Sequence, residues 1–266
     1  MNETEQILTH VLGCRRVDLY TERKALTAQQ KERVDRITSY LKRGMPLQYA
    51  LGEVDFCGLT LNIDSRALIP RPETELLVEE AMHILFSSSS SDQTVLDLGT
   101  GSGNIAISLA KFFSRCRIIA VDASEDALSL ARENARSHAV AEQIEFVHAD
   151  MARWLQTLPD RTCSMIISNP PYIPSGQLAA LPADVQQEPG MALDGGEDGL
   201  DFYRAIIAQA GRVLSFQGHL LFEFWDGQDA AIEAMLRSDR SHTWNVRFLK
   251  DFSCVNRILV AQLQTS

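Results

Sequence analysis

Hydrophobic residues along this chain follow two periods. From residue 94 onward, short apolar runs of strand length alternate with longer stretches in which apolar positions recur every three or four residues. Strands that alternate with helices pair in parallel through right-handed crossovers, so this part of the chain predicts an α/β domain. The predicted parallel strands lie at 94–98, 117–122, 144–150, 165–168 and 218–224. An antiparallel pair is predicted at 244–249 and 255–263.

The preceding residues have a different organisation. Asn2 can cap a helix that Gly13 ends, and Thr27 with Gln30 has the spacing of a capping box for a second helix. The next segment alternates apolar and polar residues around two glycines, which predicts a β-hairpin, and a long helix and a polar loop at 87–91 follow. The predicted divisions are a helical N-terminal domain at 1–43, a hairpin connector at 44–72 and a catalytic domain at 73–266.

Composition indicates a reduced, metal-free protein. The chain has 266 residues, 45% of them hydrophobic, and no apolar run approaches the length of a transmembrane helix. The five cysteines are scattered without a C-x-x-C pair, and the six histidines show no ligand spacing. We therefore expect free thiols, a cytoplasmic location, no membrane partner and no metal.

Charge is distributed unevenly. The net charge is −10, but residues 1–50 hold nine Lys/Arg and six Asp/Glu, which leaves sixteen against twenty-nine, or −13, for the remainder. An acidic catalytic domain is poorly suited to gripping a line of phosphates. No direct nucleic-acid partner is expected.

A glycine-rich turn follows the first predicted parallel strand. It consists of Gly99, Thr100, Gly101, Ser102 and Gly103, and a helical pattern begins immediately afterwards. Such a turn lets the backbone approach a ligand, and the helix N-terminus adds partial positive charge. The G-x-G-x-G spacing differs from that of a pyrophosphate cradle.

Two further positions at the same sheet edge could bind a nucleoside. Asp122 ends the second parallel strand, where an acid can accept from both hydroxyls of a ribose; alternatively, it caps the helix that begins near Ser124. Trp154 follows the third strand, which ends at Asp150, and could supply an aromatic face for adenine. The alternative for Trp154 is a tryptophan that only packs against the core.

The fourth strand ends in a polar amide, two prolines and an aromatic residue: Asn169, Pro170, Pro171 and Tyr172. Proline fixes φ and donates no backbone hydrogen bond, so the loop is stiff and its carbonyls are free to accept. Together with the Asn169 oxygen, they can receive both hydrogens of one planar NH2 group. The simpler interpretation is a proline turn that ends a strand.

In combination, these motifs resemble class I S-adenosylmethionine-dependent methyltransferases that modify planar nitrogen groups. Three further segments narrow the resemblance to the peptide chain release factor N(5)-glutamine methyltransferases, the PrmC or HemK family. They are PLQY with LG at 46–52, LIPRPETE at 68–75 and ALDGGEDGL at 192–200. EFW at 223–225 stands where the family has an E-I-G-like sequence, and 250–257 replaces a glycine-bearing turn. Both departures are expected to lie away from the cofactor edge.

The resemblance implies a Rossmann-like fold with a seven-stranded, mostly parallel sheet. It implies methyl transfer from S-adenosyl-L-methionine to the glutamine of the Gly-Gly-Gln motif in release factors, and docking of that partner by residues 1–43. Asn169 and the Pro170 carbonyl would accept the two amide hydrogens, while Tyr172 would wall the slot. The implied cofactor-binding residues are Gly99, Thr100, Gly101, Ser102, Gly103, Asp122, Trp154 and Asn169. The implied substrate-binding residues are Asn169, Pro170, Pro171 and Tyr172.

Two other functions fit parts of the pattern. A nucleic-acid exocyclic-amine methyltransferase would use the same Asn-Pro-Pro-aromatic slot, but the acidic domain and the RPET segment at 71–74 weigh against it. A non-enzymatic adaptor would keep the fold and lose cofactor binding. The intact set of Gly99, Gly101, Gly103 and Asp122 weighs against an adaptor.

Overall fold

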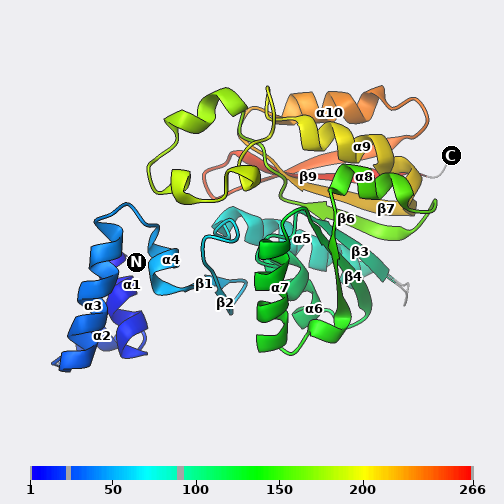
Figure 1. Cartoon of the computed structure of the whole chain (residues 1–266). Coiled ribbons are helices and arrows are strands. Elements are labelled where there is room, and N and C mark those ends of the chain that lie inside the picture. Colours follow the sequence, from blue (N-terminus) through cyan, green and yellow to red (C-terminus); the bar gives the residue numbers. More distant parts are fainter. Residues whose placement is uncertain (1, 22–24, 89–92, 265–266) are drawn as a thin grey trace.

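A helical unit, a two-stranded hairpin and a larger α/β domain follow one another along the chain (Figure 1). The computed structural model describes residues 2–21, 25–88 and 93–264. Its helices are α1 (Glu3–Leu12), α2 (Asp18–Thr21), α3 (Ala28–Leu41), α4 (Leu47–Leu51), α5 (Pro72–Ser87), α6 (Asn104–Phe112), α7 (Glu125–Ser137), α8 (Met151–Thr157), α9 (Asp201–Val213) and α10 (Asp229–Ser238). Its strands are β1 (Glu53–Phe56), β2 (Leu59–Asn62), β3 (Gln93–Leu98), β4 (Cys116–Asp122), β5 (Ile144–His148), β6 (Cys163–Ser168), β7 (Leu214–Glu223), β8 (Trp244–Lys250) and β9 (Asn256–Leu263).

The helical unit begins as its capping residues predict. The side chains of Asn2 and Thr27 each accept a hydrogen bond from the backbone N–H of the third helical residue. The side chain of that residue accepts in return from the backbone N–H of the capping residue, so both α1 and α3 start with a complete capping box. Gly13 ends α1 with φ 60°. These reciprocal bonds satisfy backbone donors that the first helical turn leaves open.

The helical unit is longer than the sequence pattern indicates. Residues 47–51, which the prediction placed in the hairpin connector, form α4. Leu47 packs in one small core with Ile7, Val11 and Ile37. Helix α4 therefore packs with the N-terminal helices beyond the boundary predicted at residue 43, and the hairpin itself spans β1 and β2. Helix α5 continues to Ser87, and positions 89–91 of the predicted polar loop lie outside the described residues.

The large sheet confirms the predicted seven-stranded architecture. Its strand order is β5-β4-β3-β6-β7-β9-β8. The first five strands in this order pair in parallel, whereas β9 is antiparallel to both β7 and β8. The order changes direction at β3, so the carboxyl ends of β3 and β6 open a crevice at the switch point. The glycine-rich turn and Asn169 follow these two strands.

Helices cover both faces of this sheet (Figure 1). Alternate strand residues point to opposite sides: Val95 packs with α5 and α6, and the adjacent Leu96 packs with α9 and α10. Burial on both faces explains why these strands read as continuous apolar runs in the sequence. The rigid sheet fixes the loops at its carboxyl edge, where the candidate site lies.

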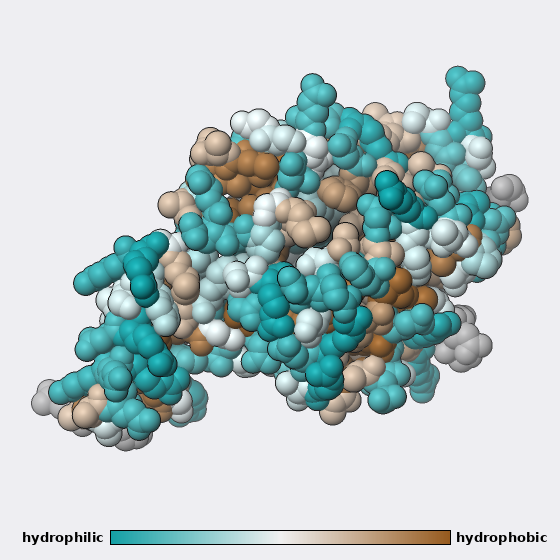
Figure 2. Space-filling model, in the orientation of Figure 1, coloured by the Kyte–Doolittle hydropathy of each residue, from teal (hydrophilic) through white to brown (hydrophobic). Residues whose placement is uncertain are grey.

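The helical unit presents a mostly hydrophilic surface in the view of Figure 2. Exposed apolar groups on the visible face of the large domain form small separate areas rather than one continuous band. Across the described residues, no helix combines the length and apolar character required to cross a membrane.

Candidate active site

The glycine-rich turn is held against the neighbouring strand by its backbone. The N–H groups of Gly99 and Thr100 both donate to the carbonyl of Val121, at 2.8 and 3.0 Å. Gly99, Gly101 and Gly103 have φ values of 75°, 56° and 83°. This left-handed backbone is accessible to glycine at little cost, and it turns the chain from β3 directly into α6.

The residues of this turn have two different roles. Gly99 and Gly101 line a cavity of about 450 Å³, large enough for a small-molecule ligand. Thr100 and Ser102 are buried instead, and the Thr100 hydroxyl donates to Oδ2 of Asp97 at 2.6 Å. Thr100, Ser102 and Gly103 therefore shape the turn and do not line the cavity, which refines their predicted role as direct contacts.

Asp97 lies beneath the turn in an unusual environment. It is fully buried, and burial raises the pKa of its carboxyl to about 7. Its Oδ2 accepts from Thr100 and from the backbone of Ala106, whereas Oδ1 has no hydrogen-bond partner within the described part of the chain. A buried polar atom without a partner is costly, so this oxygen calls for an explanation.

Asp122 is held at the cavity wall by two backbone donors. Its Oδ2 accepts from the N–H of Gly101 at 2.8 Å, and its Oδ1 accepts from the N–H of Ser124 at 2.9 Å. The hydroxyl of Ser124, rather than Asp122, caps α7. A carboxylate offers about four lone-pair sites in all, and Asp122 lines the cavity, so it can still accept from a ligand hydroxyl. Burial raises the pKa of this carboxyl.

Asn169 lines the same cavity and follows β6, the strand next to β3. Its Nδ2 donates to Oγ1 of Thr74 at 3.1 Å, and that hydroxyl donates to Oε2 of Glu223 at 2.6 Å. In the described residues, no group donates to Oδ1 of Asn169 or to the carbonyl of Pro170. These two neighbouring oxygens are thus without a partner in the described residues, and Asn169 is the one of the two residues that lines the cavity.

Sequence reasoning did not identify Thr74 or Glu223 as part of the site. Both residues lie in segments that the resemblance singled out, but they are 149 positions apart. Nothing in the local pattern of either segment indicates that the start of α5 meets the end of β7. The only available signal is the charged residue Glu223, which directly follows the apolar run 220–222 at the end of β7.

The two prolines and Tyr172 lie on different sides of the loop. Pro171 lines the cavity, while Pro170 is buried beneath it. Tyr172 packs against Trp225, with 5.6 Å between ring centroids, and burial raises the pKa of its phenol, which therefore stays protonated. Residues 223–225 were expected to lie away from the cofactor edge, and none of them lines the cavity. They do support the Asn169–Tyr172 loop, because Glu223 is bonded to Thr74 and Trp225 contacts Tyr172.

The segment 173–199 folds beside the cavity, as its Pro- and Gly-rich composition suggests. Five of its residues line the cavity: Pro189, Met191, Ala192, Asp194 and Gly196. Glu188 anchors it by accepting from Ile69 N at 3.0 Å and from Arg71 at 2.6 Å.

The glycines of this segment allow a close approach to the Asn169–Tyr172 loop. A Cβ atom at Gly195 would lie 2.8 Å from the carbonyl oxygen of Pro171, and one at Gly199 would overlap the carbonyl of Tyr172. Side chains at these positions would push the two loops apart. The glycines therefore fix the shape of the site.

Trp154 does not take its expected position. It lies on α8 and packs, partly buried, against the core of the large domain. It is not among the residues that line the cavity, whereas Met151 and Asp150 from the same region are. The structure therefore favours the packing role and offers the side chain of Met151 as the apolar surface beside Gly99, where a Cβ would lie 3.3 Å from Met151 Cε.

Comparison with known proteins supports the assignment of both parts of the chain. The "Methyltransferase domain" family matches residues 89–257, and the "PrmC N-terminal domain" family matches residues 1–52. A release factor glutamine methyltransferase from Gloeobacter violaceus is 40% identical over 243 residues, which cover 91% of this chain and 80% of the relative. The human MTRF1L release factor glutamine methyltransferase is 36% identical over 250 residues, or 88% and 73% of the two chains.

Solved structures show the same fold at lower identity. A methyltransferase from Pyrococcus furiosus superimposes with a TM-score of 0.55 at 15% identity, covering 90% of this chain and all of that one. The "PrmC N-terminal domain" family match, at residues 1–52, agrees with a helical unit that includes α4 and extends to Leu51. Given the identity to curated relatives over most of both chains, this protein belongs to the release factor glutamine methyltransferase family.

Proposed function

We propose that this protein transfers a methyl group from S-adenosylmethionine to the side-chain amide nitrogen of the glutamine in the Gly-Gly-Gln motif of peptide chain release factors, and so supports translation termination. The observation that carries this proposal is the orientation of Asn169. Its NH2 group is engaged by Thr74, and its oxygen remains available at the cavity wall. Relatives named for this activity support the choice of substrate.

The cavity has the features that the cofactor requires. Gly99 and Gly101 leave space where side chains would intrude, and Asp122 offers two carboxylate oxygens with unused lone pairs. Asp97 places a buried, partly unsatisfied carboxyl directly below the turn. When bound here, S-adenosylmethionine supplies a methyl group on a sulfonium, which is already activated for transfer.

The residues around Asn169 would act on the substrate by orientation and polarisation. An amide nitrogen is a poor nucleophile because its lone pair is delocalised into the carbonyl. Acceptance of its two hydrogens by Asn169 Oδ1 and the Pro170 carbonyl draws electron density back to nitrogen and directs the lone pair at the methyl group. Tyr172 and Trp225 would wall the outer side of the slot.

Removal of the Asp122 carboxylate is expected to weaken cofactor binding. Asp122→Ala loses the proposed ribose acceptors, and a hydrogen bond to a charged group contributes about 1.5–3 kcal/mol. We expect the dissociation constant for S-adenosylmethionine to rise about 10-fold or more. Calorimetric titration of the variant, with its thermal unfolding recorded to verify the fold, checks this; an unchanged affinity contradicts the assignment.

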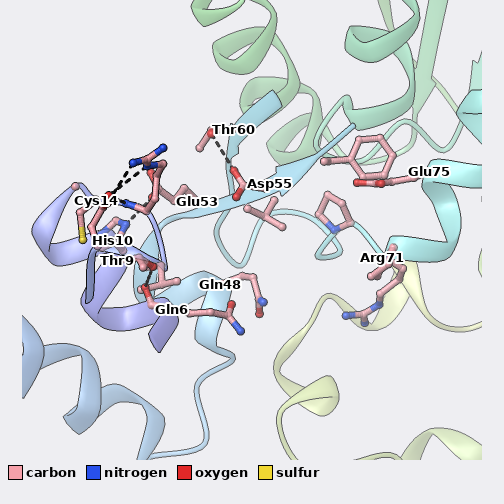
Figure 3. Close-up of a pocket in the computed structure, with 18 residues that line it drawn as sticks. Gln6, Thr9, His10, Cys14, Gln48, Glu53, Asp55, Thr60, Arg71 and Glu75 are labelled. Carbon is pink, nitrogen blue, oxygen red and sulfur yellow. Dashed lines mark hydrogen bonds and ion pairs between the residues drawn. The ribbon is translucent and has the colours of Figure 1, made fainter. Parts of the chain in front are cut away.

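The helical unit is proposed to help bind the release factor. A second cavity, of about 780 Å³, lies between α1, the hairpin and the start of α5 (Figure 3). Its lining includes polar side chains from all three elements, among them Gln6, Glu53 and Arg71. Arg71 also contacts Glu188 in the segment beside the cofactor cavity. A protein substrate that reaches Asn169 could therefore contact the helical unit as well.

Substrate identity can be tested with radiolabelled S-adenosylmethionine. Incubation with a release factor should label the factor, and changing the Gly-Gly-Gln glutamine to glutamate should abolish labelling because no amide nitrogen remains. Parallel reactions with DNA and RNA test the exocyclic-amine alternative. Undiminished labelling of the glutamate variant, or labelling of nucleic acid instead of the factor, would show that the substrate has been misassigned.

A further inference from the structure

Three elements that are distant in sequence meet behind Asn169. Thr74 lies in the first turn of α5, Glu223 ends β7, and Asn169 follows β6. Thr74 and Glu223 are only 1% and 2% exposed. The hydrogen bonds run from Asn169 Nδ2 to Thr74 Oγ1 and from Thr74 Oγ1 to Glu223 Oε2.

The chemistry of the three groups gives this chain of bonds a direction. An ionised carboxylate can only accept, and a hydroxyl has a single hydrogen to donate. Thr74 therefore donates to Glu223 and can only accept from its other neighbour. That neighbour must present an NH2 group. The amide of Asn169 consequently turns its nitrogen toward Thr74 and its oxygen to the opposite side.

We propose that Thr74 and Glu223 are positioning residues, which hold the amide of Asn169 with its oxygen rather than its nitrogen facing the substrate NH2 group. The two ends of an amide have nearly the same size, so the shape of the site alone would select between them weakly. An inverted amide would present two donors to a substrate group that also donates. This inference rests on the proposed function, because it assigns how the same site receives an amide nitrogen.

Protonation of Glu223 would reverse the direction of the chain. Burial raises the pKa of this carboxyl to about 7, and Glu73 acts in the same direction. The hydrogen bond from Thr74 and the charges of Arg257 and Arg71 lower it. The phenols of Tyr172 and Tyr203 also face it, and Tyr203 donates to the Glu223 backbone carbonyl. A protonated Glu223 can donate to Thr74, which frees the hydroxyl hydrogen for Asn169 Oδ1.

The sign of the expected pH effect follows from this reversal. Above a pH of about 7 the carboxylate is ionised and the amide is held in the productive orientation. As pH falls through that value, kcat should decline. Asp97 titrates in the same range, so the pH profile must be compared between variants.

The test uses three variants in the full chain. Thr74→Val is isosteric and removes the hydroxyl, and Thr74→Ser keeps it. Glu223→Gln replaces an acceptor-only carboxylate with an amide that can either accept or donate, so it no longer fixes the direction of the chain of bonds. We expect Thr74→Val and Glu223→Gln to lower kcat about 10–100-fold, by analogy with the loss caused by removing a residue that orients a metal-binding side chain. The cofactor dissociation constant should stay unchanged. Thr74→Ser should keep most of the wild-type kcat. The decline of kcat below a pH of about 7 that is expected in wild type should be smaller in Glu223→Gln.

A double variant separates positioning from general support of the fold. If Thr74 acts through Asn169, Thr74→Val should cause no further loss of kcat in the Asn169→Ala background. Independent, additive losses, a Thr74→Ser variant as impaired as Thr74→Val, or wild-type turnover by Thr74→Val would each overturn the inference.

A readout without substrate keeps this inference distinguishable from the proposed function. The side-chain NH2 resonances of Asn169, identified by their disappearance in Asn169→Asp, should show slow exchange in wild type. They should shift with an apparent pKa near 7 and lose protection in Thr74→Val. Signals that are identical in wild type and Thr74→Val would overturn the inference even if the release factor is methylated. If the signals respond as expected but the factor is not labelled, the substrate assignment alone is wrong.

Discussion

Replacing Asn169 with alanine is expected to lower kcat for methylation of the release factor by about 10²–10³-fold, the usual effect of removing one preorganised polar group from an active site. The lost acceptor matters most when the amide nitrogen becomes positive, so the change should appear in kcat more than in the Michaelis constant for the substrate. Steady-state kinetics with release factor and labelled cofactor, together with cofactor titration, measure both quantities.

Asn169→Asp provides a matched control of nearly the same shape. A carboxylate can accept from the substrate, but it cannot donate to Thr74, whose single hydrogen is already directed to Glu223. It also places a negative charge near the sulfonium. We expect this variant to be impaired but more active than Asn169→Ala. Near-wild-type turnover by Asn169→Ala would show that the slot is misassigned.

Gly101→Val should abolish most cofactor binding while leaving a folded protein. Gly101 lines the cavity with φ 56°, and a Cβ built there meets no protein atom within 4 Å. The valine side chain therefore enters the space for the ligand. Steric overlap of about 1–3 kcal/mol predicts an affinity loss of about 10–100-fold. The left-handed backbone strain of roughly 1–2 kcal/mol is the same in the free and bound protein, so it lowers the free energy of unfolding instead. Calorimetric titration checks the affinity loss.

Gly103→Ala serves as the contrasting variant within the same turn. A Cβ at this position would lie 2.8 Å from Ile107 Cδ1 and 3.1 Å from the Cβ of Ala131. Its main effect should be a lower free energy of unfolding, measured with denaturant, because the clash is with the core rather than with the ligand. If Gly101→Val binds the cofactor with normal affinity, the turn does not cradle it.

Elements whose signals are local could be predicted from the sequence. Both capping boxes, the glycine that ends α1 and the strands of the large sheet follow from neighbouring residues, and all appear in the structure. Helix α4 was missed because five residues give too little periodicity, and its place is set by packing of Leu47 on the N-terminal core.

The sequence predicted those parts of the candidate site in which a single local motif supplies the residue that lines the cavity. Gly99, Gly101, Asp122 and Asn169 all line it. Trp154 was expected at the cavity but does not line it. That a residue follows a strand in the sequence does not determine which side of α8 faces the cavity. Glu223 and Trp225 were missed because their contacts with Thr74 and Tyr172 join segments that only the tertiary fold brings together.

Strand β9 lies between β7 and β8, although it follows both of them along the chain. During synthesis, β8 therefore leaves the ribosome before the strand that connects it to the sheet. Until β9 emerges, the backbone groups along one edge of β7 have no strand to pair with, and the apolar side chains that β9 later helps to bury are exposed. An unpaired edge of this kind can pair with other chains and promote aggregation. The last event in forming this sheet is thus the insertion of an interior strand, so an interrupted chain exposes the middle of the sheet rather than its margin.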